Sequence, residues 1–190
     1  MLDLAIFRSI PHVQVFDPGD AVEFAAILEY SLGHEGPVYI RSNKGKHGVF
    51  HKPEFSYNPG KAEVLHEGSD IGIITTGIST LQGIRACEIL ENIGINARHI
   101  HMPCIKPVDR EEIAYTASVT GKIVTVENHS VNGGLGSAVA EVLCEEHPAM
   151  LRRLGFQDCF GETAKLDYLQ HVFGIDCNAI VSSVKAFLDS

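Results

Sequence analysis

The sequence is poor in the features that mark secreted, membrane-bound or disulfide-stabilised proteins. It contains no tryptophan and only five cysteines, an odd number that lie far apart with no C-x-x-C pair, so we expect neither a disulfide framework nor a zinc knuckle. No apolar run approaches the roughly 20 residues that a membrane-spanning helix needs. The N-terminal segment MLDLAIFRSI has no basic region and no small-residue cleavage site, so we expect no signal peptide and a cytoplasmic, reducing location.

Positive charge is also scarce. The chain has 15 Lys and Arg against 24 Asp and Glu, which gives a net charge of −9. Non-specific binding to nucleic acid or to an anionic membrane needs a basic face, so this balance argues against both kinds of partner. The remaining composition is ordinary: 190 residues, 45% hydrophobic and 21% charged, are typical of one globular domain, or of one domain with part of another.

Short apolar runs alternate with amphipathic stretches along the chain. This alternation is typical of an α/β fold with a mostly parallel sheet. The predicted strands cover residues 12–16, 37–41, 70–76, 96–102, 122–127 and 152–156. The predicted helices cover residues 80–92, 109–118, 136–147, 164–173 and 177–188.

A further helix is predicted directly after the first strand. Asp17 is the expected N-cap and Pro18 the expected first helical residue, and Gly33 lies where a helix C-terminus is expected. One face of this helix carries a regularly spaced apolar stripe, which consists of Ala21, Ala25, Leu28 and Leu32.

The predicted elements divide the chain into two unequal parts. Residues 1–41 supply half of an α/β domain, which is too little to cover both faces of a sheet. Residues 42–61 are rich in Gly, Pro, Lys and His and form the predicted connector. Residues 62–190 supply enough strands and helices for a three-layer αβα domain with a doubly wound sheet. We expect the first part to be truncated at its N-terminus or completed by another chain.

The most informative polar groups lie at predicted strand ends. In doubly wound sheets ligands bind beyond the carboxyl ends of the strands, and here these ends carry Thr76, Glu127 and His129. The loop that follows contains three glycines, Gly133, Gly134 and Gly136. Such a loop can hold a phosphate on backbone N–H groups, or it can simply let the next helix pack close to the sheet; no phosphate-binding G-x-x-x-x-G-K-[ST] motif is present. The sequence therefore leaves open a ligand-sensing or assembly module with its pocket here.

Three further groups of residues could bind a ligand or take part in a reaction. His99 and His101 lie two apart on a predicted strand, so their rings share a face and could bind a metal. Glu127 or His129 could complete such a site, although a solvated or interfacial face is the simpler interpretation. Cys104 could be a thiol nucleophile, but the prolines around it disfavour a helix start that would lower its pKa. A basic cluster could bind a phosphorylated molecule or be a solvated linker. This cluster consists of Arg41, Lys44, Lys46, His47 and His51.

Several longer strings stand in one order along the chain. They are DLAIFRSIPHVQVFDPGDAVE (3–23), GPVYIR (36–41), GKAEVLHEGSDIGIITTG (60–77), IKPVDREEI (105–113), TGKIVTVENHSVNGGLGSAVAEVL (120–143), FGET (160–163) and FGID (173–176). Together they resemble the C-terminal part of a transketolase, in particular the small subunit of split, two-chain transketolases. The KIVTVE unit with its glycine loop is also shared by 1-deoxyxylulose-5-phosphate synthases and by β subunits of 2-oxo acid dehydrogenases, whereas IKPVD, NHSVNGGLG and FGET favour transketolase.

The resemblance implies a thiamine diphosphate enzyme that moves a two-carbon ketol unit between sugar phosphates, with Mg²⁺ or Ca²⁺ holding the diphosphate. It implies that residues 1–41 are the end of the pyrimidine-binding domain, and that residues 62–190 are the C-terminal domain, which packs in the dimer. The family's catalytic Glu lies upstream of the segment that matches residue 3, and its diphosphate-and-metal motif belongs to the large subunit. We therefore expect no catalytic residue, no metal ligand and no bound cofactor in this chain alone.

One functional position can be carried over from the family. A phosphate-binding Arg lies three residues past the position of Arg41 in the family, and Lys44 stands there in this chain. A lysine pairs with phosphate as a point charge and lacks the bidentate geometry of arginine. Lys44 and Arg41 are therefore the candidate contacts to a substrate phosphate. The implied partners are a second copy of the chain, the large N-terminal transketolase subunit, or both.

Overall fold

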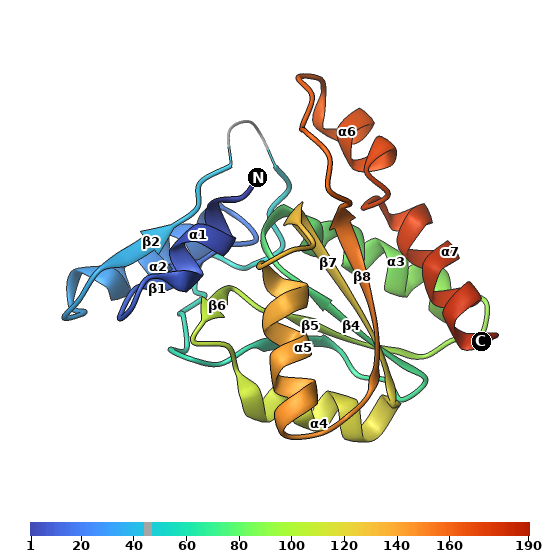
Figure 1. Cartoon of the computed structure of the whole chain (residues 1–190). Coiled ribbons are helices and arrows are strands. Elements are labelled where there is room, and N and C mark those ends of the chain that lie inside the picture. The colour runs from blue at the N-terminus through green and yellow to red at the C-terminus, as the bar shows by residue number, and fades with distance from the viewer. Residues whose placement is uncertain (44–46) are drawn as a thin grey trace.

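The structure, a computed structural model, describes residues 1–43 and 47–190. It contains one sheet of five strands, in the larger unit, and one of three, in the smaller unit. The strands are β1 (Gln14–Phe16), β2 (Val38–Ile40), β3 (Glu63–His66), β4 (Ile71–Thr75), β5 (Ala97–His101), β6 (Cys104–Lys106), β7 (Lys122–Ser130) and β8 (Met150–Phe156). Figure 1 shows the N-terminal strands β1 and β2 beside the larger unit. The helices are α1 (Asp3–Ser9), α2 (Ala21–Leu32), α3 (Thr80–Asn92), α4 (Arg110–Thr120), α5 (Leu135–Glu145), α6 (Leu166–Val172) and α7 (Cys177–Leu188), with a 3₁₀ turn at Gly77–Ser79.

The sheet of the larger unit has the strand order β3-β5-β4-β7-β8. β4 pairs parallel with β5 and β7, β7 pairs parallel with β8, and β3 runs antiparallel to β5. The central strand β4 is buried along its whole length, because its sequence IGIIT is apolar and helices cover both of its faces. The predicted α/β fold with a mostly parallel sheet is confirmed.

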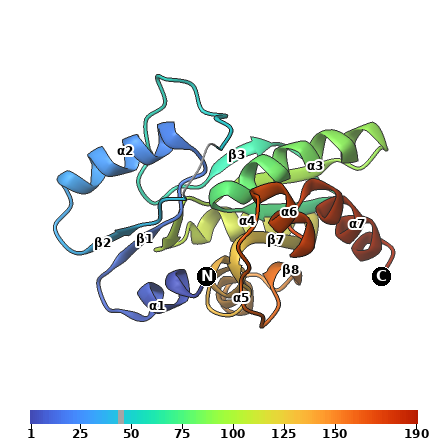
Figure 2. The same cartoon turned by 90° about the horizontal axis from the view of Figure 1, so that it is seen from above.

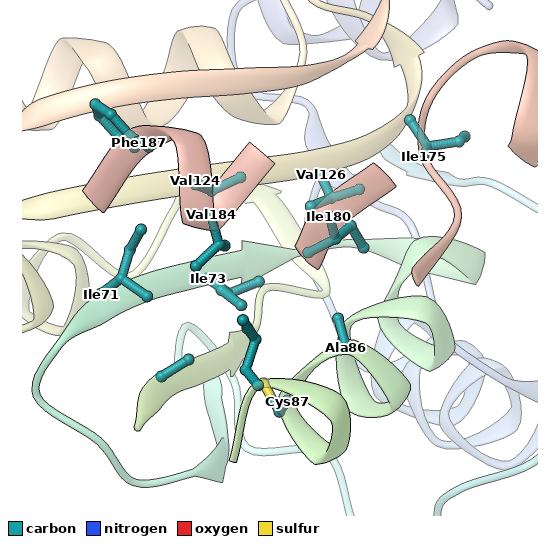
Figure 3. Packing of buried hydrophobic residues seen from close by; sticks show 12 residues of the cluster. Ile71, Ile73, Ala86, Cys87, Val124, Val126, Ile175, Ile180, Val184 and Phe187 are labelled. Carbon is teal, nitrogen blue, oxygen red and sulfur yellow. The ribbon is translucent and has the colours of Figure 1, made fainter. Parts of the chain in front are cut away.

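Helices cover both faces of this sheet, as the view in Figure 2 shows. On one face, α3 and α7 pack on the sheet through a cluster that includes Ile73, Val124 and Ile180 (Figure 3). On the other face, α4 and α5 pack through a cluster that includes Ile74 and Val139. Each aliphatic side chain buried in this way contributes roughly 1.5–3 kcal/mol, so the larger unit has a complete three-layer αβα core of its own.

The smaller sheet has the order β2-β1-β6. Alternate residues of β1 face opposite sides: Val15 packs with Leu4 of α1, and Phe16 packs with Ile27 of α2. Figure 2 accordingly shows α1 and α2 on opposite sides of β1 and β2. β2 is the outer strand among the described residues, and all three of its residues are only half-buried. The sheet thus ends in an edge that could accept another strand.

Two predictions for the helix after β1 need correction. Its N-cap is Asp20 and not Asp17: Asp20 accepts hydrogen bonds from the backbone N–H groups of Val22 and Glu23 at 3.0 and 2.9 Å. The chain from Asp17 to Asp20 is not helical and bends at Gly19 and Asp20, so the helix begins at residue 21. The predicted apolar stripe does lie on one face of α2, but the sheet contacts the helix through Glu23 and Ile27 instead. The stripe is left exposed, and it consists of Ala21, Ala25, Leu28 and Leu32.

Other differences concern short or polar strands. β3 and β6 were not predicted, because EVLH contains two polar residues and CIK is too short to show a period. β7 continues three residues beyond the predicted end at residue 127. By contrast, the helix at residue 110 begins where the capping box places it, with Asp109 accepting from Glu112 N–H at 3.2 Å. The division at residues 41 and 62 stays a prediction, since β6 pairs with β1 across it. Within residues 1–43 and 47–190, no helix is long and apolar enough to cross a membrane.

Candidate functional site

Glu127 lies inside β7, and its carboxylate reaches the start of α5. Oε2 accepts a hydrogen bond from Leu135 N–H at 2.7 Å, and Oε1 accepts one from Gly136 N–H at 2.8 Å. The side chain is fully buried. It pairs two of the N–H groups that a helix N-terminus leaves without partners, and its charge suits the positive end of the helix dipole. A carboxylate of the chain itself therefore fills the place where a strand–loop–helix unit could hold a phosphate.

The loop glycines make this contact possible. Gly134 packs so closely on the carboxylate that a Cβ atom there would overlap Glu127 Oε2 and lie 2.7 Å from His129 Nδ1. Gly133 has a φ of 84°, a conformation that glycine adopts without steric cost. A Cβ atom at Gly136 would lie 2.8 Å from Thr125 Oγ1. In this structure the three glycines let the helix start approach the sheet and the buried carboxylate.

The pKa values of Glu127 and His129 both differ from their ordinary values. Burial raises the pKa of Glu127 to about 7, against the two backbone hydrogen bonds that lower it. Burial lowers the pKa of His129, whose Nδ1 donates to the Ser130 carbonyl at 2.7 Å. A carboxyl group that titrates near neutrality beside an uncharged imidazole has the character of an acid–base pair. However, both side chains are fully buried, with 3.7 Å between Glu127 Oε2 and His129 Nδ1.

Thr76 occupies a similar interior position at the end of β4. Its Oγ1 donates to the Met102 carbonyl at 2.8 Å, which joins the ends of β4 and β5. Thr76, Glu127 and His129 each have no exposed surface. In this arrangement a ligand from solvent cannot contact any of the three.

Arg41, one of the two candidates for the substrate phosphate, is committed to internal partners. Its Nε lies 3.1 Å from Asp3 Oδ2, and its Nη1 lies 3.4 Å from Asp17 Oδ2. Nη1 also donates to the Asn128 carbonyl at 2.9 Å. Asp17 is fully buried, and this burial raises the pKa of its carboxyl group, which the Arg41 charge opposes. The guanidinium thus ties β2 to α1 and β7. Lys44, the other candidate, lies outside the described residues, as does Lys46 of the basic cluster.

A cavity of about 390 Å³ opens beyond the carboxyl ends of β1 and β2. This is the edge at which doubly wound sheets bind their ligands. Residues at and just before the start of α2, residues just after β2, the connector and the 3₁₀ turn line it. They include Gly19, Asp20, Phe24, Arg41, Asn43 and His47. Of the described parts of the smaller unit, this cavity is the best candidate for a contact with a small molecule.

His99 and His101 share a face, as predicted, but both are fully buried, so the prediction of a solvated face is wrong; His101 instead faces Glu23 of the smaller unit. His99 Nε2 lies 2.9 Å from Thr75 Oγ1, and burial lowers the pKa of His99 to about 3. His101 bonds Glu23 Oε2 through Nε2 at 2.7 Å, and Thr80 Oγ1 through Nδ1 at 2.8 Å. The described residues contain no group of three or more His, Cys, Asp or Glu side chains that could hold a metal ion.

The thiol hypothesis for Cys104 is also contradicted. Cys104 lies in β6, is buried, and has a pKa raised to about 12 by this burial. A nucleophilic cysteine needs a lowered pKa and access to a substrate. Cys104 therefore acts as a small core residue beside Phe16 and Ile27.

Sequence reasoning missed two residues that join the smaller unit to the larger one. Asp20 caps α2, and Glu23 Oε2 accepts from Gly19 N–H at 2.7 Å in addition to its contact with His101. Asp20 and Glu23 have the D-x-x-E spacing of a capping box. The same spacing predicts the helix at residue 110, so the signal was present here, but the adjacent Pro18 favours an earlier helix start.

Comparisons with known proteins bear on these observations. The family described as "Transketolase, C-terminal domain" matches residues 60–180. The chain is 41% identical to the "6-deoxy-6-sulfo-D-fructose transketolase subunit SqwH" of Clostridium sp. (strain MSTE9), over 95% of this chain and 56% of that protein. It is 36% identical to 1-deoxy-D-xylulose-5-phosphate synthase 1 of Geobacter sulfurreducens, over 99% of this chain and 30% of that protein.

A solved structure agrees closely with the fold. The structure described as "Split gene transketolase, inactive beta4 tetramer" matches with a TM-score of 0.93 and 40% identity, over 99% of this chain and 61% of that one. The chain thus spans about half the length of that transketolase subunit of Clostridium. The resemblance drawn from the sequence strings is confirmed: this chain belongs to the transketolase family, and residues 60–180 are its C-terminal domain.

Proposed function

We propose that this chain is one part of a split transketolase, and that it transfers no ketol unit until the large N-terminal subunit and the rest of the pyrimidine-binding domain complete it. The observation that carries this proposal is the contrast between the two units. The larger unit has a complete core, whereas the smaller unit ends at the outer strand β2 and leaves the apolar stripe of α2 exposed. Additional strands and helices of the pyrimidine-binding domain would cover both features. A second copy of the chain is a further proposed partner.

The described residues do not by themselves fit thiamine diphosphate, the cofactor that the family implies for the full enzyme. The diphosphate and its metal need several ligating side chains, and the described residues contain no such cluster. The two buried carboxyl groups with raised pKa, Asp17 and Glu127, face Arg41 and the start of α5. We propose that the large subunit supplies the groups that hold the cofactor and the metal ion.

The proposed contribution of this chain to substrate binding is the cavity beyond β1 and β2. Arg41 lines it, but Asp3 and Asp17 balance the charge of Arg41. Lys44 is therefore the better candidate for the sugar phosphate, to which it would offer a point charge. All five cysteines are free, which suits the reducing cytoplasm that we propose as the location.

The test is turnover of xylulose 5-phosphate with ribose 5-phosphate in the presence of thiamine diphosphate and Mg²⁺. We expect no turnover with the purified chain alone, and turnover only after it is combined with both the large subunit and the segment of the pyrimidine-binding domain that carries the family's catalytic Glu. In the combined enzyme, Lys44→Met should raise KM for the phosphorylated substrates, whereas Lys52→Met, at an exposed position of the connector, should not. Robust turnover by the lone chain would contradict the proposal.

The same assay separates the proposal from its alternatives. Turnover of pyruvate with glyceraldehyde 3-phosphate, in place of the sugar phosphate pair, would assign the chain to a 1-deoxyxylulose-5-phosphate synthase. Pyruvate oxidation would assign it to a 2-oxo acid dehydrogenase β subunit. A module without catalysis would leave the combined enzyme inactive on all three while calorimetry still shows binding of a sugar phosphate to the lone chain.

A further inference from the structure

His51 lies in the connector and is almost completely buried, with 8% of its surface exposed. Its ring stands between two carboxylates from distant parts of the chain. Nε2 forms a hydrogen bond of 2.7 Å with Glu63 Oε2 on β3. Nδ1 lies 3.1 Å from Asp20 Oδ2 at the start of α2, a charge contact whose angle is too poor for a hydrogen bond. The histidine therefore bridges the smaller unit and the larger one.

Only the protonated ring of His51 attracts both neighbouring carboxylates, Asp20 and Glu63. A neutral imidazole carries one N–H group, and its other nitrogen presents a lone pair. If the proton is on Nε2, the lone pair of Nδ1 faces Asp20 Oδ2 at 3.1 Å; if it is on Nδ1, the lone pair of Nε2 faces Glu63 Oε2 at 2.7 Å. Either neutral form places a nitrogen without a proton beside a carboxylate oxygen, whereas the imidazolium ion donates to Glu63 and attracts Asp20 through its charge.

Asp20 fastens the connector in a second way. Its Oδ2 accepts hydrogen bonds from the backbone N–H groups of Phe50 and His51, both at 2.8 Å. Its Oδ1 accepts from the first turn of α2. One carboxylate thus caps the helix and anchors the connector, and the cation that faces it is His51. If the ring becomes neutral with its proton on Nε2, the lone pair of Nδ1 repels this oxygen, and the cation that balances the charge of Asp20 is lost.

The other groups that face the ring are also known. From α2 they are Asp20 and Glu23, from β3 Glu63, and from β5 His101, whose ring centroid lies 6.2 Å away. His101 is itself bonded to Glu23. The surroundings are therefore anionic. Burial by itself lowers the pKa of His51, but the contacts with Glu63, Glu23 and Asp20 outweigh it and raise this pKa above 6.5.

We propose that His51 is a positioning residue whose proton fastens the connector to both units, and so fixes the wall of the cavity beyond β1 and β2. Asp20 and His47 line that cavity, so the anchor at Asp20 sets where the connector runs past it. The contribution of His51 to folding is complete below pH 6.5 and is lost as the pH rises through the higher pKa of the folded state. The proposal goes beyond ketol transfer and needs no turnover for its test.

The experiment is an NMR titration of the full-length chain between pH 5.5 and 9, with amide hydrogen exchange measured at each pH. We expect the His51 ring to titrate above 6.5, and the protection factors of the Phe50 and His51 amides to fall about tenfold across that titration, the scale of a hydrogen bond to a charged group. Protection factors are used because they correct for the intrinsic effect of pH on exchange.

Two variants complete the test. His51→Gln keeps a donor for Glu63 but cannot be charged, so its connector amides should show low protection at every pH, without a step. His171→Gln removes another His–carboxylate pair, His171 with Asp176, that is exposed, and it should leave the step at Phe50 unchanged. Titration of His51 at or below 6.5, or protection that stays constant through its titration, would overturn the proposal. The wild-type titration decides the matter even if His51→Gln does not fold.

Discussion

In each unit a carboxylate binds the start of a helix, but the pKa of one carboxyl group is lowered and the pKa of the other is raised. Asp20 caps α2 directly and accepts four backbone N–H groups, two from the helix and two from the connector. These bonds and His51 lower its pKa, although burial acts against this. Glu127 reaches α5 from β7, accepts two N–H groups and is fully buried, and burial raises its pKa to about 7.

The difference shows how each unit is built. In the larger unit, the apolar core packs around the helix start and excludes water from Glu127. This loss of water raises the pKa of the carboxyl group. In the smaller unit, the buried apolar clusters are smaller, and charged groups also hold the elements together: Asp20 with His51, and Arg41 with Asp3 and Asp17. We therefore expect substitutions of charge to damage the smaller unit, and substitutions of volume to damage the larger one.

Arg41→Met should have the largest effect. Methionine keeps much of the side-chain length but leaves Asp17 buried without its cation, and breaking a buried ion pair from one side costs about 3–5 kcal/mol. We expect a loss of this order in the free energy of unfolding, measured by urea denaturation at pH 7. As a control, Asp17→Asn combined with Arg41→Met removes both charges and should recover part of the loss. A loss well below 1 kcal/mol for the single variant would show that packing, and not charge, holds the smaller unit.

Gly134→Ala is the matching test in the larger unit. The new Cβ atom would overlap Glu127 Oε2, and the buried carboxylate cannot move without losing its hydrogen bonds to α5. Forcing extra volume into a packed site costs about 1–3 kcal/mol, and we expect a value near the upper end in thermal unfolding. Gly33→Ala at the end of α2 is the control, because its nearest neighbour, Tyr30 O, lies 3.8 Å away; it should be neutral.

The same contrast explains what the sequence could predict. The larger unit follows local rules: apolar runs such as IGIIT become buried strands, and the helix predicted over residues 177–188 is α7 itself. The glycine loop before α5 was located correctly. What its glycines approach could not be predicted, because Glu127 meets Leu135 and Gly136 only after the strand and the helix have packed.

The candidate site in the smaller unit was harder to predict for a physical reason. Asp17 and Asp20 are three residues apart and chemically alike, and both can cap a helix; Arg41 pairs with the first and His51 with the second. These partners lie 24 and 31 residues further along the chain. No local pattern indicates which aspartate a distant cation will neutralise, so the choice depends on the tertiary structure.

The pH dependence of stability offers a third test of the comparison, with opposite signs at the two helix starts. A carboxyl group with a raised pKa destabilises the folded state once it ionises, so the Glu127 contribution should fall as the pH rises from 4.5 to about 7. The lowered pKa of Asp20 acts in reverse: its contribution is present above its ordinary pKa of 3.8 and is lost as the pH falls below it.

The effect of Glu127 should be about 3 kcal/mol over the whole range, because its pKa rises from 4.5 to about 7 with the two backbone hydrogen bonds already included, and each pH unit of that rise corresponds to about 1.4 kcal/mol. Urea unfolding at several pH values measures it. Glu127→Gln should weaken the protein at pH 5 and remove the decline between pH 5 and 7. The contribution of His51 is lost at higher pH, and the NMR titration separates the two groups. An unchanged decline in Glu127→Gln would assign the decline to another group.

The smallest effect is expected at a charged contact between the units that water can reach. Arg8 Nη2 on α1 lies 2.8 Å from Glu141 Oε2 on α5, and the glutamate side chain is 58% exposed. Exposed ion pairs contribute about 0.2–1 kcal/mol and are screened by salt, so Glu141→Gln should reduce the free energy of unfolding by less than about 1 kcal/mol, and by less still in 0.5 M NaCl. Arg8 keeps its 2.8 Å hydrogen bond to the Gly133 carbonyl in this variant. Arg8 and Arg41 join the same pair of units and differ chiefly in how exposed their carboxylate partners are to water. A loss of stability as large as that of Arg41→Met would therefore mean that burial of the partner does not determine how much an ion pair contributes.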